Sequence, residues 1–444
     1  MMDNIMFINR TTELKALNEE YQSKNATFSV VYGRRRVGKT ALLSKYIEDK
    51  PSIYLYITLS DLKTQLKHFS EQLKVYAPLG ISKHLRFESF EEALEFLSTL
   101  ELKEKLVLVI DEYQYLTQLD LGFSSKLQKV WDMSLKNANI HLILCGSVLS
   151  MMHSEVLAYN APLYGRRTSQ FHIKAIKFHH IKEFVPKVSR LELMQIFASF
   201  GSIPKYLNEY DTQLNFMQNI EKKILNKNAY LYSEGNFLLK DEISDARSYF
   251  SILESISKGN TKIGHIGASL GLASSYLTKY MQRLIELDIV QKEVPITEKN
   301  PLKSKFGRYK IKDKFLNFWF FYVFKNYNYL EIQQTQAVLD EIDINFNDRF
   351  VSFAFEDYVL EDVVKNPVKY MNFTPTKVGR WWNNKEEIDI VAFDDENICF
   401  IECKWQNSVD VESVKHKLIQ KAVNIVEGKK AFYAVVTKEG YLLQ

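Results

Sequence analysis

Short apolar runs alternate with amphipathic stretches over the first 175 residues. Residues 28–32, 53–57 and 106–110 are β-branched, aromatic or leucine-rich runs of strand length. Between them, stretches such as residues 41–47 repeat apolar side chains at the spacing of one helix face. Strands that alternate with helices predict an α/β fold with a parallel sheet. The run at 106–110 is apolar throughout, which is typical of a central strand covered on both faces.

The pattern changes in the second half of the chain. Three short helical stretches between residues 245 and 285 precede two strand-like runs, 289–295 and 306–311. Gly271 marks the turn before the last of these helices, and we expect Ser274 to cap that helix. Helix–turn–helix followed by a hairpin predicts a winged helix.

The last third of the chain contains two strand-like runs around the polar turn at residues 394–397. A four-residue hairpin at that turn pairs Phe393 with Ile398 and therefore places Asp389 opposite Glu402. Like charges in opposed positions are unfavourable, so a bridging divalent cation is a natural explanation for this pair.

Composition narrows the class of protein. The 444 residues are enough for about three domains, and 25% charged with 13% aromatic residues indicates folded rather than disordered protein. The net charge of +4 is nearly balanced, so a nucleic-acid signal has to be local. Three cysteines without a C-x-x-C pair suit a reducing compartment, and nine histidines show no zinc-ligand spacing. With no leader and no apolar run long enough for a bilayer, we expect a cytoplasmic protein without a membrane partner.

A complete G-x-x-x-x-G-K-[ST] phosphate loop follows the strand at residues 28–32. Its glycines let backbone N–H groups turn toward phosphate oxygens at the positive end of the next helix. Lys39 would reach the β- and γ-phosphates, and the Thr40 hydroxyl would hold Mg²⁺. The alternative, a glycine turn beside a solvated basic run, leaves the strand–loop–helix setting unexplained. The sequence therefore predicts ATP and Mg²⁺ as ligands, with nucleotide contacts from Gly33, Arg34, Arg35, Arg36, Val37, Gly38, Lys39, Thr40 and Ala41.

Two carboxylates, Asp111 and Glu112, end the apolar strand at residues 106–110. In an open α/β sheet, ligands bind at the carboxyl ends of the strands. We expect Asp111 to hold Mg²⁺ and Glu112 to orient and deprotonate the attacking water. A strand that merely runs into a solvated turn is the alternative. Ser147 after the next strand is a candidate γ-phosphate sensor.

Further along, Arg166 lies beside a turn, next to Arg167. An arginine in this position can stabilise charge in the transition state, so Arg166 is a candidate catalytic residue. The alternative is a surface arginine pair without a catalytic role.

Six segments in this order and spacing resemble one family, the archaeal-type, STAND-like ATPases of the AAA+ superfamily. The segments are FINRTTEL, GRRRVGKT, VIDEYQYL, LILCGS, PLYGRRT and GSIPKYL. The resemblance implies that Arg10, in the first segment, lies on the adenine side of the nucleotide, and that the Gly-x-Pro segment belongs to a helical lid. An ordinary helix capped by Thr11 or Thr12 is the alternative for the first segment.

The tail carries a second chemical signal. Asp389 with Glu402 and Lys404 resembles the core of PD-(D/E)XK nucleases, and Glu356 matches the first-helix acid of that fold. The resemblance implies a metal at Asp389 and Glu402, with Lys404 and Glu356 as catalytic residues. A solvated two-strand ribbon with chance carboxylates is the alternative. The expected domains are a P-loop ATPase core at 1–175, a helical lid at 176–244, a winged helix at 245–325 and a nuclease-like domain at 326–444.

Basic residues crowd the hairpin expected at residues 289–311. A patch of this kind neutralises DNA phosphates without reading sequence, and the alternative is a packing module with a solvated loop. The residues predicted to contact double-stranded DNA are Lys299, Lys303, Lys305, Arg308 and Lys310.

Together these features predict an ATPase that uses Mg²⁺ and couples ATP hydrolysis to DNA binding or processing, with a nuclease-like tail. The competing hypothesis is a nucleotide-switched regulator whose winged helix and tail only bind partners. The sequence sets neither the DNA target, the cellular process, the activity of the tail nor the oligomeric state, and assembly into an oligomer stays open.

Overall fold

The computed structural model describes residues 7–82, 85–240, 242–243 and 246–443. The chain forms two compact units, one ending at Ile176 and the other beginning at Lys177. No helix among these residues is long and apolar enough to span a membrane.

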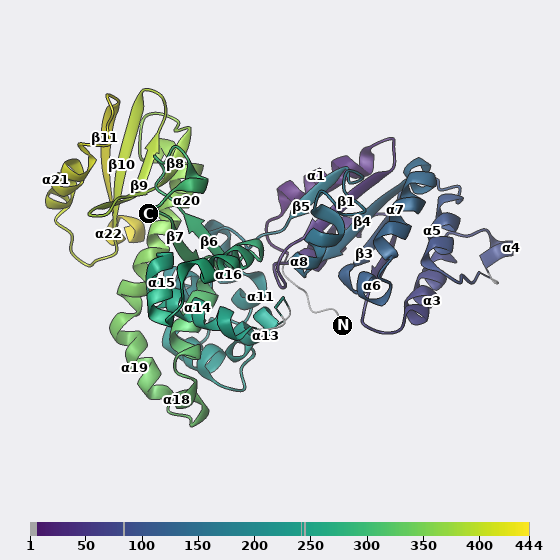
Figure 1. Cartoon of the computed structure of the whole chain (residues 1–444), viewed down its shortest axis with the longest axis horizontal. Coiled ribbons are helices and arrows are strands. Elements are labelled where there is room, and N and C mark those ends of the chain that lie inside the picture. Colours follow the sequence, from purple (N-terminus) through teal and green to yellow (C-terminus); the bar gives the residue numbers. More distant parts are fainter. Residues whose placement is uncertain (1–6, 83–84, 241, 244–245, 444) are drawn as a thin grey trace. The chain divides into compact units, whose positions relative to one another are not determined.

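The first unit is built on a five-stranded sheet in the order β2-β3-β4-β1-β5. Figure 1 labels four of these strands, β3, β4, β1 and β5. All four strand pairings are parallel, which confirms the α/β prediction. The strands are β1 (Thr27–Tyr32), β2 (Ser52–Tyr56), β3 (Leu106–Asp111), β4 (Ile140–Gly146) and β5 (Ser169–His172). The helices of this unit are α1 (Thr11–Gln22), α2 (Lys39–Ile47), α3 (Leu62–Leu73), α4 (Leu79–Ser82), α5 (Phe90–Ser98), α6 (Gln114–Leu119), α7 (Phe123–Met133) and α8 (Leu149–Met152).

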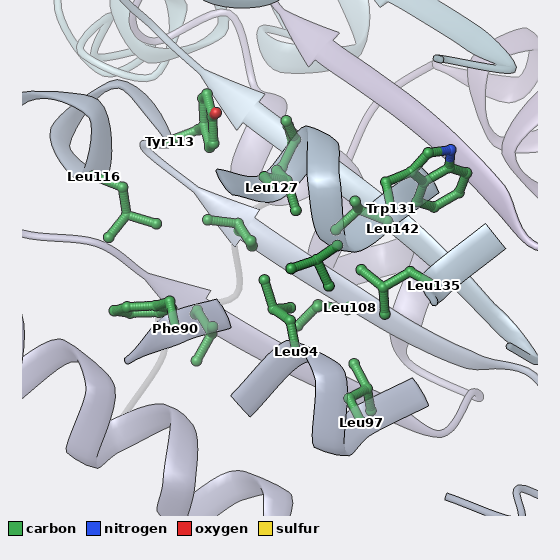
Figure 2. Packing of buried hydrophobic residues seen from close by; sticks show 14 of the residues in the cluster. Phe90, Leu94, Leu97, Leu108, Tyr113, Leu116, Leu127, Trp131, Leu135 and Leu142 are labelled. Atoms are coloured by element: carbon green, nitrogen blue, oxygen red, sulfur yellow. The ribbon is translucent and has the colours of Figure 1, made fainter. Parts of the chain in front are cut away.

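Apolar layers cover both faces of this sheet. On one face Leu108 and Leu142 pack with Phe90 and Leu94 of α5 and Leu127 of α7 (Figure 2). On the other face, the alternate strand residues pack against α1 and α2; this cluster includes Val107, Val109, Ile143, Leu17 and Leu42. Burial of each such side chain contributes about 1.5–3 kcal/mol, which explains why β3 and β4 are mainly apolar before their ends, with His141 of β4 as the exception.

The second unit begins with short helices: α9 (Ile181–Phe184), α10 (Arg190–Ser199), α11 (Pro204–Leu207), α12 (Phe216–Asn219) and α13 (Glu234–Lys240). Three helices and an antiparallel hairpin follow, in the element order predicted for a winged helix. They are α14 (Arg247–Ser257), α15 (Ile263–Leu270), α16 (Ser274–Glu286), β6 (Val290–Glu293) and β7 (Arg308–Ile311).

A further group of helices leads into a four-stranded sheet with the order β11-β10-β9-β8. The strands are β8 (Lys377–Trp382), β9 (Glu387–Phe393), β10 (Asn397–Lys404) and β11 (Lys430–Thr437). The helices are α17 (Lys314–Phe318), α18 (Tyr327–Glu331), α19 (Thr335–Phe346), α20 (Ser352–Lys365), α21 (Val411–Ala422) and α22 (Lys438–Leu443). Short 3₁₀ or π turns lie at Leu135–Asn137, His153–Leu157, Phe178–His180, Ile220–Leu225, Tyr230–Tyr232, Pro301–Lys303, Trp319–Phe324, Asn347–Val351 and Pro367–Lys369.

The predicted register of the tail hairpin is confirmed, because Phe393 pairs with Ile398. The predicted pairing of Asp389 with Glu402 is not part of the ladder, which ends where Ile390 faces Ile401. On its other side, β9 has a register shift between Gly379 and Trp381 of β8. A shift of this kind adds a residue and re-aims the side chains beside it.

Two predicted helix caps are wrong. Helix α16 begins at Ser274 itself, without a side-chain cap, so this serine lies inside the helix. Helix α1 begins at Thr11, and the residue before it is Arg10, whose backbone is left-handed with φ 71°. Arg10 cannot supply a serine-like cap. Its guanidinium bonds to distant carbonyls instead, as described below.

Candidate nucleotide site and charged clusters of the second unit

The phosphate loop joins β1 to α2 and requires glycine at both ends. A Cβ atom on Gly33 would lie 2.2 Å from the carbonyl oxygen of Ile173, which follows β5. Gly38 has φ 95° and directly precedes the first residue of α2, a backbone conformation that glycine adopts without strain. The loop is therefore bent as a phosphate cradle at the N-terminus of a helix.

Lys39 is buried, and its ammonium donates to the carbonyl oxygens of Gly33 at 2.8 Å and Arg34 at 3.0 Å. Burial lowers the pKa of Lys39, and nearby acids including Asp111 and Glu112 oppose that shift. A buried cation whose partners are uncharged carbonyls is well suited to exchange them for phosphate oxygens.

The rest of the predicted loop residues have varied surroundings. Arg35 donates to the hydroxyl of Tyr115 at 3.0 Å. Val37 is buried in the core, Arg34 is also buried, and Arg36 has φ 72°. Ala41 lies half-buried in the first turn of α2.

Arg10 supports the loop from the protein side. Its guanidinium donates to the carbonyl oxygens of Val37 at 3.0 Å and Lys174 at 2.6 Å, and it forms an ion pair with Glu13 at 3.2 Å. These contacts tie the first segment to the loop. A direct contact of Arg10 with the nucleotide stays a prediction.

Asp111 and Thr40 meet beside the loop, as expected of a magnesium site. The Thr40 hydroxyl donates to Asp111 Oδ2 at 3.1 Å, and the amide of Glu112 donates to Asp111 Oδ1 at 2.9 Å. The hydroxyl of Tyr54, in β2, donates to the same Oδ2 at 2.6 Å. A hydroxyl and a carboxylate are the oxygen ligands that Mg²⁺ prefers, so the residues present fit this ion.

Glu112 lies between the ends of β3 and β4. Its Oε2 accepts hydrogen bonds from Ser147 at 2.8 Å and from the buried side-chain amide of Gln114. Its backbone is left-handed, with φ 56°. The predicted sensor serine therefore lies in direct contact with the predicted base.

Sequence reasoning missed Tyr54 and Gln114. The register between β2 and β3 explains the contact of Tyr54, because Tyr56 lies opposite Asp111 and the side chain two residues earlier lies on the same face. The sequence alone does not give this register. Gln114 gives no sequence signal either, because its contact depends on the turn after β3.

Arg166 is held in an ion pair within the first unit. Its Nη2 lies 2.7 Å from Oδ2 of Asp132 in α7, and its Nη1 donates to the carbonyl oxygens of Pro162 and Tyr164. These contacts account for the side chain within its own unit, and a role at the phosphates stays a prediction.

The tail carboxylates are engaged by neighbouring donors. Glu356 pairs with Arg380 at 2.6 Å, and Asp389 accepts a hydrogen bond from the amide of Cys403 at 2.7 Å. Glu402 Oε1 accepts from Lys404 at 2.9 Å and Lys421 at 3.2 Å. Burial, followed by the charge of Asp389, raises the pKa of Glu356 to about 8.

The tail acids Asp389, Glu402 and Glu356 meet some of the requirements of a metal site but not all of them. Burial and the charge of Glu402 raise the pKa of Asp389 to about 6, so the two carboxylates repel each other. Glu402 Oε2 is buried and has no hydrogen-bond partner among the residues that the structure describes. However, within the described parts of the chain no three His, Cys, Asp or Glu side chains are placed to hold a metal ion. Glu356 is directed to Arg380 rather than to such a cluster.

The basic residues predicted to contact DNA fall into two groups. Lys299, Lys303 and Lys305 are exposed, and none of them forms an ion pair with a residue that the structure describes. Arg308 and Lys310 instead contact the tail. Arg308 pairs with Glu387 at 2.9 Å and lies 4.6 Å from the ring centre of Trp382. Lys310 pairs with Glu293 at 2.6 Å and Asp357 at 3.2 Å.

Helix α16 adds an exposed polar face that the sequence analysis left out. Its exposed residues include Ser275, Thr278, Lys279 and Gln282, while Leu277 faces the core. Short polar and basic side chains on an exposed helix can contact phosphates and base edges.

Comparison with known proteins gives two family matches. A family described as an ATPase domain predominantly from Archaea matches residues 7–210. A second family, described as archaeal and bacterial proteins of unknown function, matches residues 319–417.

Among individual proteins, the uncharacterized protein MJECL04 of Methanocaldococcus jannaschii is 37% identical over 441 residues, which cover 98% of this chain and 96% of that protein. An uncharacterized ATP-binding protein of the same organism is 46% identical over 46 residues, covering 10% of this chain and 78% of that protein. The solved structure of the Walker-type ATPase PABY2304 of Pyrococcus abyssi aligns with a TM-score of 0.52 at 19% identity, covering 71% of this chain and 96% of that chain. The structural likeness supports the P-loop ATPase fold.

Proposed function

The chain belongs to the ATPase family found predominantly in Archaea and is an ATP-binding ATPase. We propose that it hydrolyses ATP with Mg²⁺ and couples hydrolysis to binding of double-stranded DNA. The ATPase activity is inferred mainly from one observation: five predicted site residues lie together at the carboxyl ends of β1, β3 and β4. They are Lys39, Thr40, Asp111, Glu112 and Ser147.

Each of these residues has a distinct task in the proposal. Lys39 binds the β- and γ-phosphates, and Thr40 with Asp111 holds Mg²⁺, which neutralises phosphate charge when bound. Glu112 accepts a proton from the attacking water, and the hydrogen bond from Ser147 fixes the direction of its carboxylate. The side-chain amide of Gln114 provides a second fixed donor to the same oxygen.

DNA binding is proposed for the second unit. The order α14, α15, α16 and hairpin suits a winged helix. We assign the phosphate contacts to the exposed Lys299, Lys303 and Lys305 and to Lys279 of α16. Arg308 and Lys310 pair with acids of the same chain, so we place them outside the contact surface.

The salt bridges of Arg308 with Glu387 and of Lys310 with Asp357 favour a second candidate function. This is a nucleotide-switched regulator whose hairpin only packs against the tail. The deciding experiment measures binding of the full chain to a labelled DNA duplex over a range of salt, with ATP, with ADP and without nucleotide. Binding that changes with nucleotide and falls steeply with salt supports coupling to DNA. Absence of duplex binding in all three states favours the regulator.

Cleavage by the tail is a separate proposal, which the buried, unpartnered Oε2 of Glu402 favours. A divalent cation between Glu402 and Asp389 would offset the repulsion between these acids and supply an activated water. Nicking of supercoiled plasmid by the purified chain in Mg²⁺ or Mn²⁺ tests it. Loss of nicking in Glu402→Gln would assign the activity to this site.

A further inference from the structure

Tyr54 is a partly buried tyrosine of β2 that the ATPase motifs do not include. Its hydroxyl lies 2.6 Å from Asp111 Oδ2, which also accepts from Thr40 at 3.1 Å. The carboxylate of Asp111 is thus held between one hydroxyl from the phosphate-loop helix and one from strand β2.

The position of this hydroxyl is set by the strand. In β2, which is one of the two edge strands of the sheet, Tyr54 pairs in register with Val109 of β3. The side-chain amide of Gln72 accepts from the backbone N–H of Tyr54 at 3.1 Å and donates to its carbonyl at 3.0 Å. The ring packs against the apolar cluster beneath α2. Backbone and ring are both fixed, so the hydroxyl is directed at Asp111 before any ligand arrives.

We infer that Tyr54 is a positioning residue for the magnesium–nucleotide complex, holding the Asp111 carboxylate in the direction from which it serves the metal. The inference rests on the proposed roles of Thr40 and Asp111. Thr40 and Asp111 would hold Mg²⁺, whereas the Tyr54 hydroxyl is not one of the proposed ligands and would keep the Asp111 carboxylate from rotating. Preorganised ligands bind metal more tightly because less freedom is lost on binding.

The hydroxyl of a partly buried tyrosine also needs a partner, so a purely structural role has to be distinguished. Such a role would affect stability and all nucleotide binding alike. A positioning role affects only the binding that depends on Mg²⁺. Tyr76 offers a matched control, because its hydroxyl bonds to the backbone N–H and carbonyl of Ser52 at 3.0 and 3.1 Å, at the start of the same strand.

The experiment measures the affinity of the full chain for a fluorescent ADP analogue, in MgCl₂ and in EDTA, for wild type, Tyr54→Phe and Tyr76→Phe. We expect Tyr54→Phe to weaken affinity in MgCl₂ by about three- to tenfold and to leave affinity in EDTA within twofold. Tyr76→Phe should change neither affinity, although it lowers the melting temperature. Incorporation of 3-fluorotyrosine at position 54, which keeps the ring and the hydroxyl, should restore the affinity in MgCl₂.

Two results would overturn the inference: affinities in MgCl₂ and EDTA that fall together, or an affinity in MgCl₂ that is unchanged or tighter in Tyr54→Phe. If wild type binds the analogue in neither condition, the proposed nucleotide site itself is wrong. Melting curves identify a variant that fails to fold. A Tyr54→Phe chain that does not fold would show a structural role for the hydroxyl and would also overturn the inference.

Discussion

Gly33 is a residue whose identity the neighbouring strand imposes. The carbonyl oxygen of Ile173 occupies the place where a Cβ atom would lie, 2.2 Å away. Any larger residue would push the chain after β5 away from β1. Here the packing of two backbones and the turn of the phosphate loop require the same glycine.

Replacement of Lys39 by alanine tests the phosphate cradle. The variant removes the ammonium that lies on the Gly33 and Arg34 carbonyls, and we expect kcat/KM for ATP to fall by about 100-fold or more because no other side chain replaces it. Lys45→Ala is the matched control, because Lys45 is an exposed lysine of the same helix paired with Glu48. If Lys39→Ala hydrolyses ATP as fast as wild type, the assignment of Lys39 to the phosphates is wrong.

Glu112→Gln tests the division of work between the two acids. The amide cannot accept a proton, so we expect ATP binding within about threefold of wild type and single-turnover hydrolysis slower by about 100-fold or more. Asp111→Asn, by contrast, should weaken binding in Mg²⁺. If both variants lose binding to the same extent, the roles assigned to Asp111 and Glu112 are wrong.

At the level of the elements, side chains as well as backbone join β4 to its neighbours. His141 lies near the start of β4. Its ring nitrogens lie 2.7 Å from the hydroxyl of Ser29 in β1 and 2.8 Å from that of Tyr46 in α2. The histidine thereby connects the central strand to the helix that begins at the phosphate loop.

Burial lowers the pKa of His141 from its ordinary 6.5 to about 3, which makes the first unit acid-sensitive. Below pH 6.5 the unfolded chain takes up a proton that the folded chain refuses, so stability falls as the pH drops from 6.5 toward 3. Between pH 7.5 and 5.5 we expect a loss of about 1.4 kcal/mol, measured by native-state hydrogen exchange of β4 amides. His141→Gln should abolish this component, and an unchanged pH slope in that variant would contradict the explanation.

The hairpin β6–β7 supplies the next prediction at this scale. Neutralising Lys299, Lys303 and Lys305 together should weaken duplex binding and lower the slope of log K against log salt by about one unit for each lost contact. Removing three exposed lysines elsewhere in the second unit, Lys222, Lys227 and Lys417, is the control. If the slope of log K against log salt is the same in both variants, the hairpin does not contact DNA and serves only in packing.

At the scale of the whole molecule, the prediction to test is that the tail binds a divalent cation of its own. In an Asp111→Asn background, which weakens the first metal site, Mn²⁺ titration should still detect a site that Glu402→Gln removes, because Glu402 Oε2 is buried without a partner. Arg380→Ala should leave Glu356 free to join that site and tighten it. Absence of Mn²⁺ binding in the Asp111→Asn protein would mean that the tail is a binding module rather than a nuclease.

The alternation of apolar runs and the phosphate-loop motif were enough to predict the parallel sheet, the loop between β1 and α2, and the approach of Asp111 to Thr40. These features depend on period, turn length and strand order, which are local or nearly local properties. The tail register was predictable for the same reason, since a four-residue turn determines which residues of its two strands pair.

Other contacts depended on long-range packing. Tyr54 meets Asp111 because an edge strand lies beside β3, and Arg166, Arg308 and Lys310 are satisfied by acids far away in sequence. The ladder between β9 and β10 ends at Ile390 and Ile401, so Asp389 and Glu402 are not paired in it. A charge can be read from one chain position, but its partner is chosen by the folded surroundings, because Coulomb and hydrogen-bond energies depend on distances that only tertiary packing sets.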